Sequence, residues 1–252
     1  MKTIIITTLL SLMVFSFKLT AQDLVTDRPD QTESSSTIPK NSIQIEAGFL
    51  SGNGENKFDE QLLIPTTLIR YGLTRIIELR LGEQIEYKPN GINSKTNFGI
   101  SDLELGAKIQ ILRKENINTE IAFLSHIILP TGTDILSINK IGTINKIAFS
   151  HSISTVFNIG YNLGYNYFGK GKGDFTYSSV LGIKVSEKIG TYVEIYGELT
   201  EFKDFVVNFD SGLTYLLRPN LQFDFSFGLG LNKKMNYLAI GFSWNINTKK
   251  NR

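Results

Sequence analysis

The 252-residue sequence contains no cysteine, only two histidines, six prolines and a single tryptophan. The lack of cysteine excludes disulfides and thiolate metal sites, and it leaves no residue for lipidation of a mature N-terminus. Beyond the N-terminus no run of about eighteen apolar residues occurs, so no membrane-spanning helix is expected. No HExxH, GxSxG or nucleotide-binding glycine motif is present either. We therefore predict no metal site, no bound cofactor and no enzymatic activity.

The first 21 residues have the features of a secretory signal peptide. Lys2 gives a positive start, residues 4–17 are apolar, and Ala21 precedes the expected cleavage point. The alternative, a buried N-terminal strand or helix, is disfavoured by the polar run that follows. Removing residues 1–21 also removes Lys2 and Lys18, which leaves 24 basic and 24 acidic residues. This balance gives no support to nucleic-acid binding.

From Ser42 onward, apolar and polar residues alternate with a period of two, and no good 3.6-residue pattern appears. In FNIGYNLGYNYF, residues 157–168, bulky side chains occupy the odd positions and Asn or Gly most of the even ones. Twelve candidate strands of this kind can be counted, many of them ten to twelve residues long. Ordinary strands average about five or six residues, whereas a tilted strand crosses a bilayer core in roughly nine to eleven.

A soluble β-sandwich would also alternate, with its apolar face in a core instead of in lipid. Three features favour the membrane barrel: the export signal, a polar face rich in Gly and Asn with charges of both signs, and aromatic residues near strand ends. These aromatic residues, expected to form interfacial girdles, are Tyr71, Tyr87, Phe168, Phe175, Tyr192, Phe202, Phe205, Tyr215, Tyr237 and Trp244.

We therefore predict an all-β fold, a closed antiparallel transmembrane β-barrel of about 12 strands of the outer-membrane type. It spans residues 42–247 and is followed by a polar tail, 248–252. Long connections are expected at the outer end and short turns at the periplasmic end, but the short turn EFKD leaves the strand count open by two. The expected partners are outer-membrane lipid, a small-molecule solute and, during biogenesis, the barrel assembly machinery and periplasmic chaperones.

Charged and amide side chains on the polar face are expected to line the lumen. They form either a selectivity lining for solutes or a salt-bridge lattice that stiffens the wall and narrows the lumen, and the two roles are compatible. The predicted lumen-lining residues are Glu46, Arg70, Glu78, Arg80, Asp102, Glu104, Lys108, Asn158, Asn162, Lys184, Glu194, Glu198, Asp210 and Asp224.

Residues 22–41 are polar, contain two prolines, and are expected to form an irregular periplasmic leader. Two interpretations stay open. The leader is either a solvated segment, or a plug that folds back into the periplasmic mouth and pairs with charges of the wall. The residues that would make this plug are Asp27, Arg28, Asp30, Gln31 and Glu33.

A hydrolase on the barrel wall would need a histidine beside a nucleophile. Ser125 directly precedes His126, so the two side chains point to opposite faces of their strand. His151 lies between two serines in an expected turn. Neither arrangement favours catalysis.

Several blocks of the sequence resemble a known family: TDRPDQTESSSTIPKNSIQIEAGF, RYGLTRIIELRLG, SDLELGAKIQI, ILPTG and FDSGLTYLLRPNLQFDFSFGLGLN. Over nearly all of the mature chain, the sequence is similar to the meta-pathway phenol-degradation family of outer-membrane transporters. The resemblance implies a barrel that passes small hydrophobic or aromatic compounds, and it supplies no catalytic residues.

Function is thus expected to be passive transport or binding of small solutes at the bacterial outer membrane. The alternative is a structural or adhesive barrel whose lumen is blocked, and a wall hydrolase is a weaker third interpretation. Conductance in planar bilayers would separate the first two.

Overall fold

The computed structural model describes residues 24–54, 61–89, 96–114, 117–134 and 136–247. The predicted signal peptide and the polar tail lie outside the described residues. Within them, no helix is long and apolar enough to span a membrane. The described strands are β1 (Ser42–Asn53), β2 (Gln61–Gly72), β3 (Ile77–Pro89), β4 (Thr96–Ile100), β5 (Leu103–Lys114), β6 (Ile117–Leu129), β7 (Gly142–Ser152), β8 (Phe157–Tyr167), β9 (Asp174–Lys184), β10 (Ile189–Thr200), β11 (Asp204–Arg218), β12 (Leu221–Gly230) and β13 (Asn236–Asn247).

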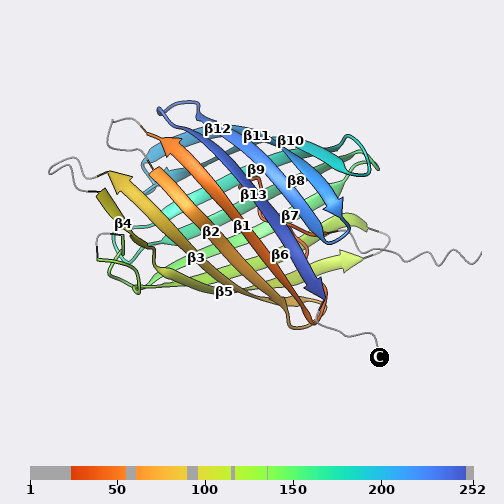
Figure 1. The fold of residues 1–252 in the computed structure, drawn as a ribbon, viewed down its shortest axis with the longest axis horizontal. Coiled ribbons are helices and arrows are strands. Elements are labelled where there is room, and N and C mark those ends of the chain that lie inside the picture. Colours follow the sequence, from red (N-terminus) through yellow and green to blue (C-terminus); the bar gives the residue numbers. More distant parts are fainter. Residues whose placement is uncertain (1–23, 55–60, 90–95, 115–116, 135, 248–252) are drawn as a thin grey trace, which may run out of the picture.

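All strands belong to one antiparallel sheet, which closes because β1 pairs with β13 along its whole length. Strands β4 and β5 pair with successive parts of β3, so they form one stave that is interrupted at Ser101 and Asp102. The thirteen strands therefore make twelve staves, and the predicted fold class and strand count are confirmed. Closure pairs both edges of the staves, except at β4, which among the described strands pairs only with β3. An unpaired edge inside a bilayer would cost several kcal/mol per polar group. Figure 1 shows the long tilted strands of this barrel.

The two ends of the barrel differ in their connections. Ser42 and Asn247 pair at one end, which we call the terminal rim, and the opposite end is the loop rim. Connections at the terminal rim are short: 73–76, 115–116, 153–156, 185–188 and 219–220. Connections at the loop rim are longer, except the turn at 201–203: 54–60, 90–95, 130–141, 168–173 and 231–235. This is the predicted contrast, including the short turn in EFKD.

Along most strands, alternation sends apolar side chains outward and polar ones inward, whereas on β6 the buried positions include Ala122, Leu124 and Ile128. On β8, Leu163 is 46% exposed on the outer surface, whereas its neighbour Asn162 is only 4% exposed and faces the lumen. The outer surface carries a wide apolar belt, as lipid contact requires. Large exposed apolar residues include Leu79, Ile109, Ile127, Ile147, Val193, Ile195, Leu213, Phe225, Leu238 and Ile240.

The predicted aromatic girdle needs a correction at two positions. Tyr192 and Tyr237 are buried, and Tyr237 donates a hydrogen bond to Asp210 at 2.5 Å inside the barrel. Side chains alternate between the two faces of a strand, and the positions of Tyr192 and Tyr237 in this alternation point both inward. Nearness to a strand end does not change the alternation. Six of the predicted girdle residues are exposed as expected: Tyr71, Phe175, Phe202, Phe205, Tyr215 and Trp244.

We expect Leu163→Arg to impair barrel assembly, because an arginine facing lipid near the bilayer centre costs about 2–4 kcal/mol. The matched control is Asn158→Arg on the same strand, whose side chain lies exposed among lumen cavities. Heat-modifiable migration of the membrane fraction measures assembly. Equal loss of the folded band in both variants would contradict the assignment of faces.

Candidate functional site

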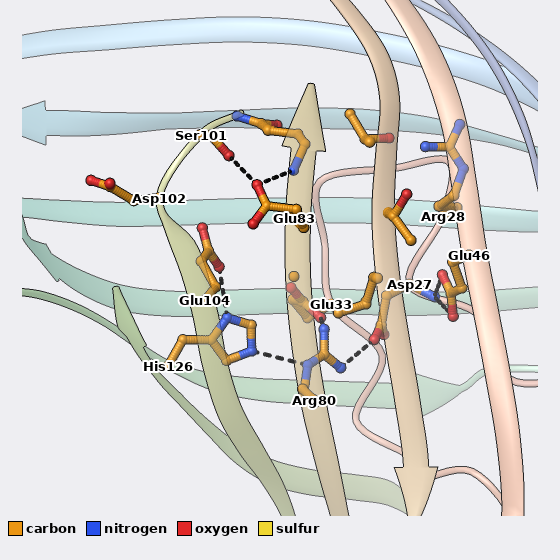
Figure 2. A pocket seen from close by; sticks show the side chains of 15 residues that line it. Asp27, Arg28, Glu33, Glu46, Arg80, Glu83, Ser101, Asp102, Glu104 and His126 are labelled. Atoms are coloured by element: carbon orange, nitrogen blue, oxygen red, sulfur yellow. Dashed lines mark hydrogen bonds and ion pairs between the residues drawn. The ribbon is translucent and has the colours of Figure 1, made fainter. Parts of the chain in front are cut away.

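The leader lies inside the barrel. Its described part, residues 24–41, forms no helix or strand and enters from the terminal rim as a loop. One arm is held where the Val25 carbonyl accepts hydrogen bonds from Gln44 and Arg70. The other arm is held where the Ile38 amide donates to Glu78. Between the arms, residues 27–33 form a tip that contacts opposite walls of the lumen, and part of this contact is seen in Figure 2.

Asp27 is the most strongly bound residue of the tip. Its carboxylate lies 2.6 Å from Arg80 Nη1, 2.9 Å from Lys108 Nζ and 3.3 Å from Arg70 Nη1, with 3% of the side chain exposed. Burial by itself would raise the pKa of Asp27, but these three cations hold that pKa well below its ordinary value. The tip therefore carries a permanent negative charge at this point.

The wall beneath Asp27 has its own salt-bridge lattice. Arg70 pairs with Glu46 at 2.6 Å and with Glu78 at 2.7 Å, and Arg80 reaches Glu78 at 3.0 Å. Lys108 differs, because its carboxylate partners among the described residues both come from the leader. They are Asp27 and, at 3.8 Å, Glu33. The wall alone therefore leaves a positive charge that the leader neutralises.

Arg28 points to the opposite wall. Its Nε and Nη2 atoms donate to the two oxygens of Asp224 at 3.1 and 2.8 Å, a two-point contact that orients the guanidinium. The guanidinium lies on Gly48 and Gly241. A Cβ atom at either position would come within 2.5 or 2.3 Å of it. A larger residue at either position would require the guanidinium to move, and at position 241 its Cβ would also come within 2.6 Å of the Ala47 carbonyl oxygen.

Backbone and hydroxyl groups bind the rest of the tip. The Gln31 amide donates to Glu194 at 2.7 Å. The Thr32 hydroxyl lies 2.5 Å from Glu194 and 2.7 Å from the Ser178 hydroxyl. Asn162 makes two bonds to the backbone of Glu33: its Oδ1 accepts from the amide at 2.6 Å and its Nδ2 donates to the carbonyl at 3.2 Å. Thr32 was not among the predicted plug residues, although its hydroxyl stands in the same polar run.

Asp30 departs from the prediction that it pairs with a wall charge. Among the described residues it forms no ion pair. Burial raises its pKa well above the ordinary value, and the nearby carboxyls of Glu194, Asp210 and Asp27 add to the rise. The wall at this point presents acids instead of cations, which the leader sequence by itself does not reveal.

His126 is a lumen residue that the prediction left out of the lining. Its Nε2 accepts from Arg80 Nε at 3.0 Å, so Nδ1 carries the proton and donates to Glu104 at 2.9 Å. Figure 2 shows this chain of side chains from Glu104 to Asp27. His151 lies elsewhere, 2.8 Å from the Thr119 hydroxyl and stacked on Tyr161. The even position of His126 on its strand was the available signal.

Four predicted lining residues lie away from the tip. Asp102, at the interruption between β4 and β5, accepts hydrogen bonds from the amides of Gly132 and Ile138 and so holds the 130–141 connection. Glu198 accepts from Thr200 near the loop rim. Asn158 and Lys184 lie at the terminal rim, where Lys184 pairs with Glu187.

The lumen is divided by the leader into separate cavities. Two cavities on the side of the loop rim hold about 220 and 320 Å³. Two on the side of the terminal rim hold about 390 and 320 Å³. Leader residues line all four. Within the described residues, no group of three or more His, Asp or Glu side chains could hold a metal ion.

Closed strand pairing, a polar interior and an apolar outer belt define a barrel of the porin type. The sequence matches the family described as "Putative MetA-pathway of phenol degradation" over residues 26–246. This protein belongs to that family, and the resemblance found in the sequence is confirmed.

The fold is similar to that of solved porins. KdgM porin, alone or in complex with disordered oligogalacturonate, superposes with a TM-score of 0.58 at 9% identity, covering 80% of this chain and 98% of that chain. The CymD monoaromatic hydrocarbon channel gives a TM-score of 0.47 at 9% identity, covering 85% of this chain and 90% of that chain. No curated protein matches the sequence.

Asp27→Asn should release the tip, because it leaves Arg70, Arg80 and Lys108 short of one negative charge. Loss of one partner of a buried ion pair costs about 3–5 kcal/mol. The chain has no native cysteine, so Ser35→Cys, at a position 2% exposed, reports release through its reaction with a water-soluble maleimide. We expect this reaction to be at least tenfold faster with Asp27→Asn. An unchanged rate would show that Asp27 does not hold the leader.

Docking of the leader should also depend on pH through Asp30. Because its pKa is raised, the contribution of Asp30 to docking is fully present below the ordinary value of 3.8 and is lost as the pH rises towards the raised pKa. Asp27 has a lowered pKa, so its contribution is lost only as the pH falls below that ordinary value, and the two ranges do not overlap.

The measurement is the reaction rate of Ser35→Cys divided by that of the exposed Ser51→Cys, which cancels the titration of the thiol itself. The ratio should rise with pH, and Asp30→Asn should flatten it. A rise that persists with Asp30→Asn would assign the effect to another group.

Proposed function

We propose that this protein is exported to the bacterial outer membrane, where it conducts small solutes passively, and that its leader is a movable plug. The family membership and the porin-type fold support a transporter. The tip of the leader supports gating, because it is bound on opposite sides of the lumen. Export by the predicted signal peptide, and insertion by the barrel assembly machinery with periplasmic chaperones, belong to the same proposal.

The set of ion pairs between tip and wall carries this proposal. Asp27 bonds to Arg80 and Lys108 on one side, and Arg28 bonds to Asp224 on the other. Removing a single partner leaves a buried charge unpaired, which is costly. Withdrawing the whole leader lets water solvate both partners of each pair, so these contacts are suited to reversible closure.

The proposal also concerns the chemistry of the solute. The family description suggests an aromatic compound, yet the cavities are lined mainly by charged, amide and hydroxyl groups. We therefore propose a solute that carries polar groups. His126 is held by Arg80 and Glu104 and has no described serine partner, which gives a wall hydrolase no support.

A structural or adhesive barrel with a blocked lumen is the second candidate, and the docked leader is the observation in its favour. Single-channel recording in planar bilayers separates the two. The native protein should be mostly closed. Gly48→Ala should raise the open fraction severalfold, because the three atoms nearest to its added Cβ would be guanidinium atoms of Arg28, at 2.5–2.6 Å. Gly82→Ala is the control, since the atoms nearest to its Cβ would belong to the Glu104 side chain, at 3.3–3.9 Å.

Deletion of residues 22–40 is the decisive variant. A folded, heat-modifiable barrel that lacks this segment should conduct continuously. If such a barrel shows no conductance, the pore interpretation is wrong and the blocked-lumen barrel replaces it.

A further inference from the structure

The cavity of about 320 Å³ on the side of the loop rim, which we call the amide cavity, has a chemistry of its own. Its wall is built by five neighbouring staves, β7 to β11. Strand register places Asn162, Ser178, Tyr196 and Asn208 side by side at one level across β8 to β11. Gln31, in the tip of the leader, also lines this cavity. The site therefore combines rigid wall positions with the docked tip.

The polar groups of the amide cavity are mostly uncharged. Amides come from Gln31, Asn162, Asn166 and Asn208, and hydroxyls from Thr176 and Ser178. Its two charged residues, Lys146 and Glu198, have opposite signs. The neighbouring cavity of about 220 Å³ differs, because Asp27, Glu46, Arg80, Glu83, Asp102 and Glu104 line it. Neutral amide groups are thus concentrated in the amide cavity, whereas the neutral groups of the 320 Å³ cavity on the side of the terminal rim are mostly hydroxyls.

Part of the hydrogen-bonding capacity of these amides is unused. Asn166 Oδ1 is buried and has no hydrogen-bond partner among the described residues. A buried amide oxygen without a partner costs free energy, so a rotation of the Asn166 side chain that brings this oxygen to a donor in the cavity is favourable. An amide offers both donors and an acceptor, which matches hydroxyl groups that also donate and accept. Tyr196 adds an aromatic ring against which a ring-shaped solute can pack.

We propose that the amide cavity binds one uncharged ring that carries several hydroxyl groups, as in a neutral sugar. This inference rests on the proposed function and names the class of solute. A single-hydroxyl ring such as phenol would leave most of the amide groups unsatisfied. An anion or a cation would meet a pocket of no net charge. The volume suits one ring, because an apolar cavity of about 150 Å³ already holds benzene.

The location couples the bound ring to the plug. Asn162, which lines the cavity, also makes both hydrogen bonds to the Glu33 backbone. Gln31, which lines it too, donates its backbone N–H to Glu194. A solute that competes for Asn162 or displaces Gln31 therefore acts directly on the contacts that hold the tip.

The test is calorimetric titration of the purified full-length protein with a matched set of probes: glucose, glucuronate, glucosamine and phenol. Glucose should bind, and the other three should bind at least tenfold more weakly. Asn208→Leu and Asn166→Ala should each weaken glucose binding by roughly fivefold to tenfold, the effect of one or two lost hydrogen bonds. Glu83→Gln, in the other cavity, should leave glucose binding unchanged.

Absence of glucose binding, tighter binding of any other probe, or equal affinity in the Asn208→Leu and Asn166→Ala variants would overturn the proposed site. Bilayer conductance distinguishes failure of the proposed binding site from failure of the transport proposal. Glucose binding in a protein that never conducts, even without residues 22–40, would retain the site and remove transport. Conductance without glucose binding would do the reverse.

Discussion

The carboxylate of Asp27 is the contact on which the arrangement of the lumen depends. Three buried cations from three neighbouring staves, Arg70, Arg80 and Lys108, converge on it. Three positive side chains cannot stay close together in a poorly hydrated interior without a shared counter-charge. Glu46 and Glu78 supply part of it from the wall, and the leader supplies the rest. The position of the leader is thus an electrostatic consequence of where the wall places these three cations.

Asp27 and Arg28, which are adjacent in the sequence, bind walls of opposite charge. Asp27 faces the basic patch of β2, β3 and β5, whereas Arg28 crosses to Asp224 on β12. Beyond Asp224 the wall turns acidic and carries Glu194 and Asp210, which Asp30 approaches without a cation. A short segment with alternating charge can bind both walls, and a segment of one sign could bind only one.

The sequence was sufficient for the fold because each strand repeats the same two-residue period over a length that suits a bilayer. It also pointed to Asp27, Arg28 and Glu33 as residues that would pair with wall charges, in one of the two interpretations of the leader that it left open. The sequence does not show which staves face each other across the lumen, so it does not predict the wall partners of the leader. This is why a wall cation is expected beside Asp30, where the structure places carboxyl groups. Tyr192 and Tyr237 were assigned by nearness to a strand end, although their parity sends them inward.

Glycines on the lumen face leave enough room in the barrel for both the leader and the cavities beside it. Large side chains at positions 48 and 241 would fill the floor on which the Arg28 guanidinium lies. On β8 the alternating glycines and asparagines do something related, because Gly160 lies under Thr32 while Asn162 binds the backbone of Glu33. The small residues on the lumen face therefore have two roles. They leave space for the side chains of the leader, and they keep room for water in the interior.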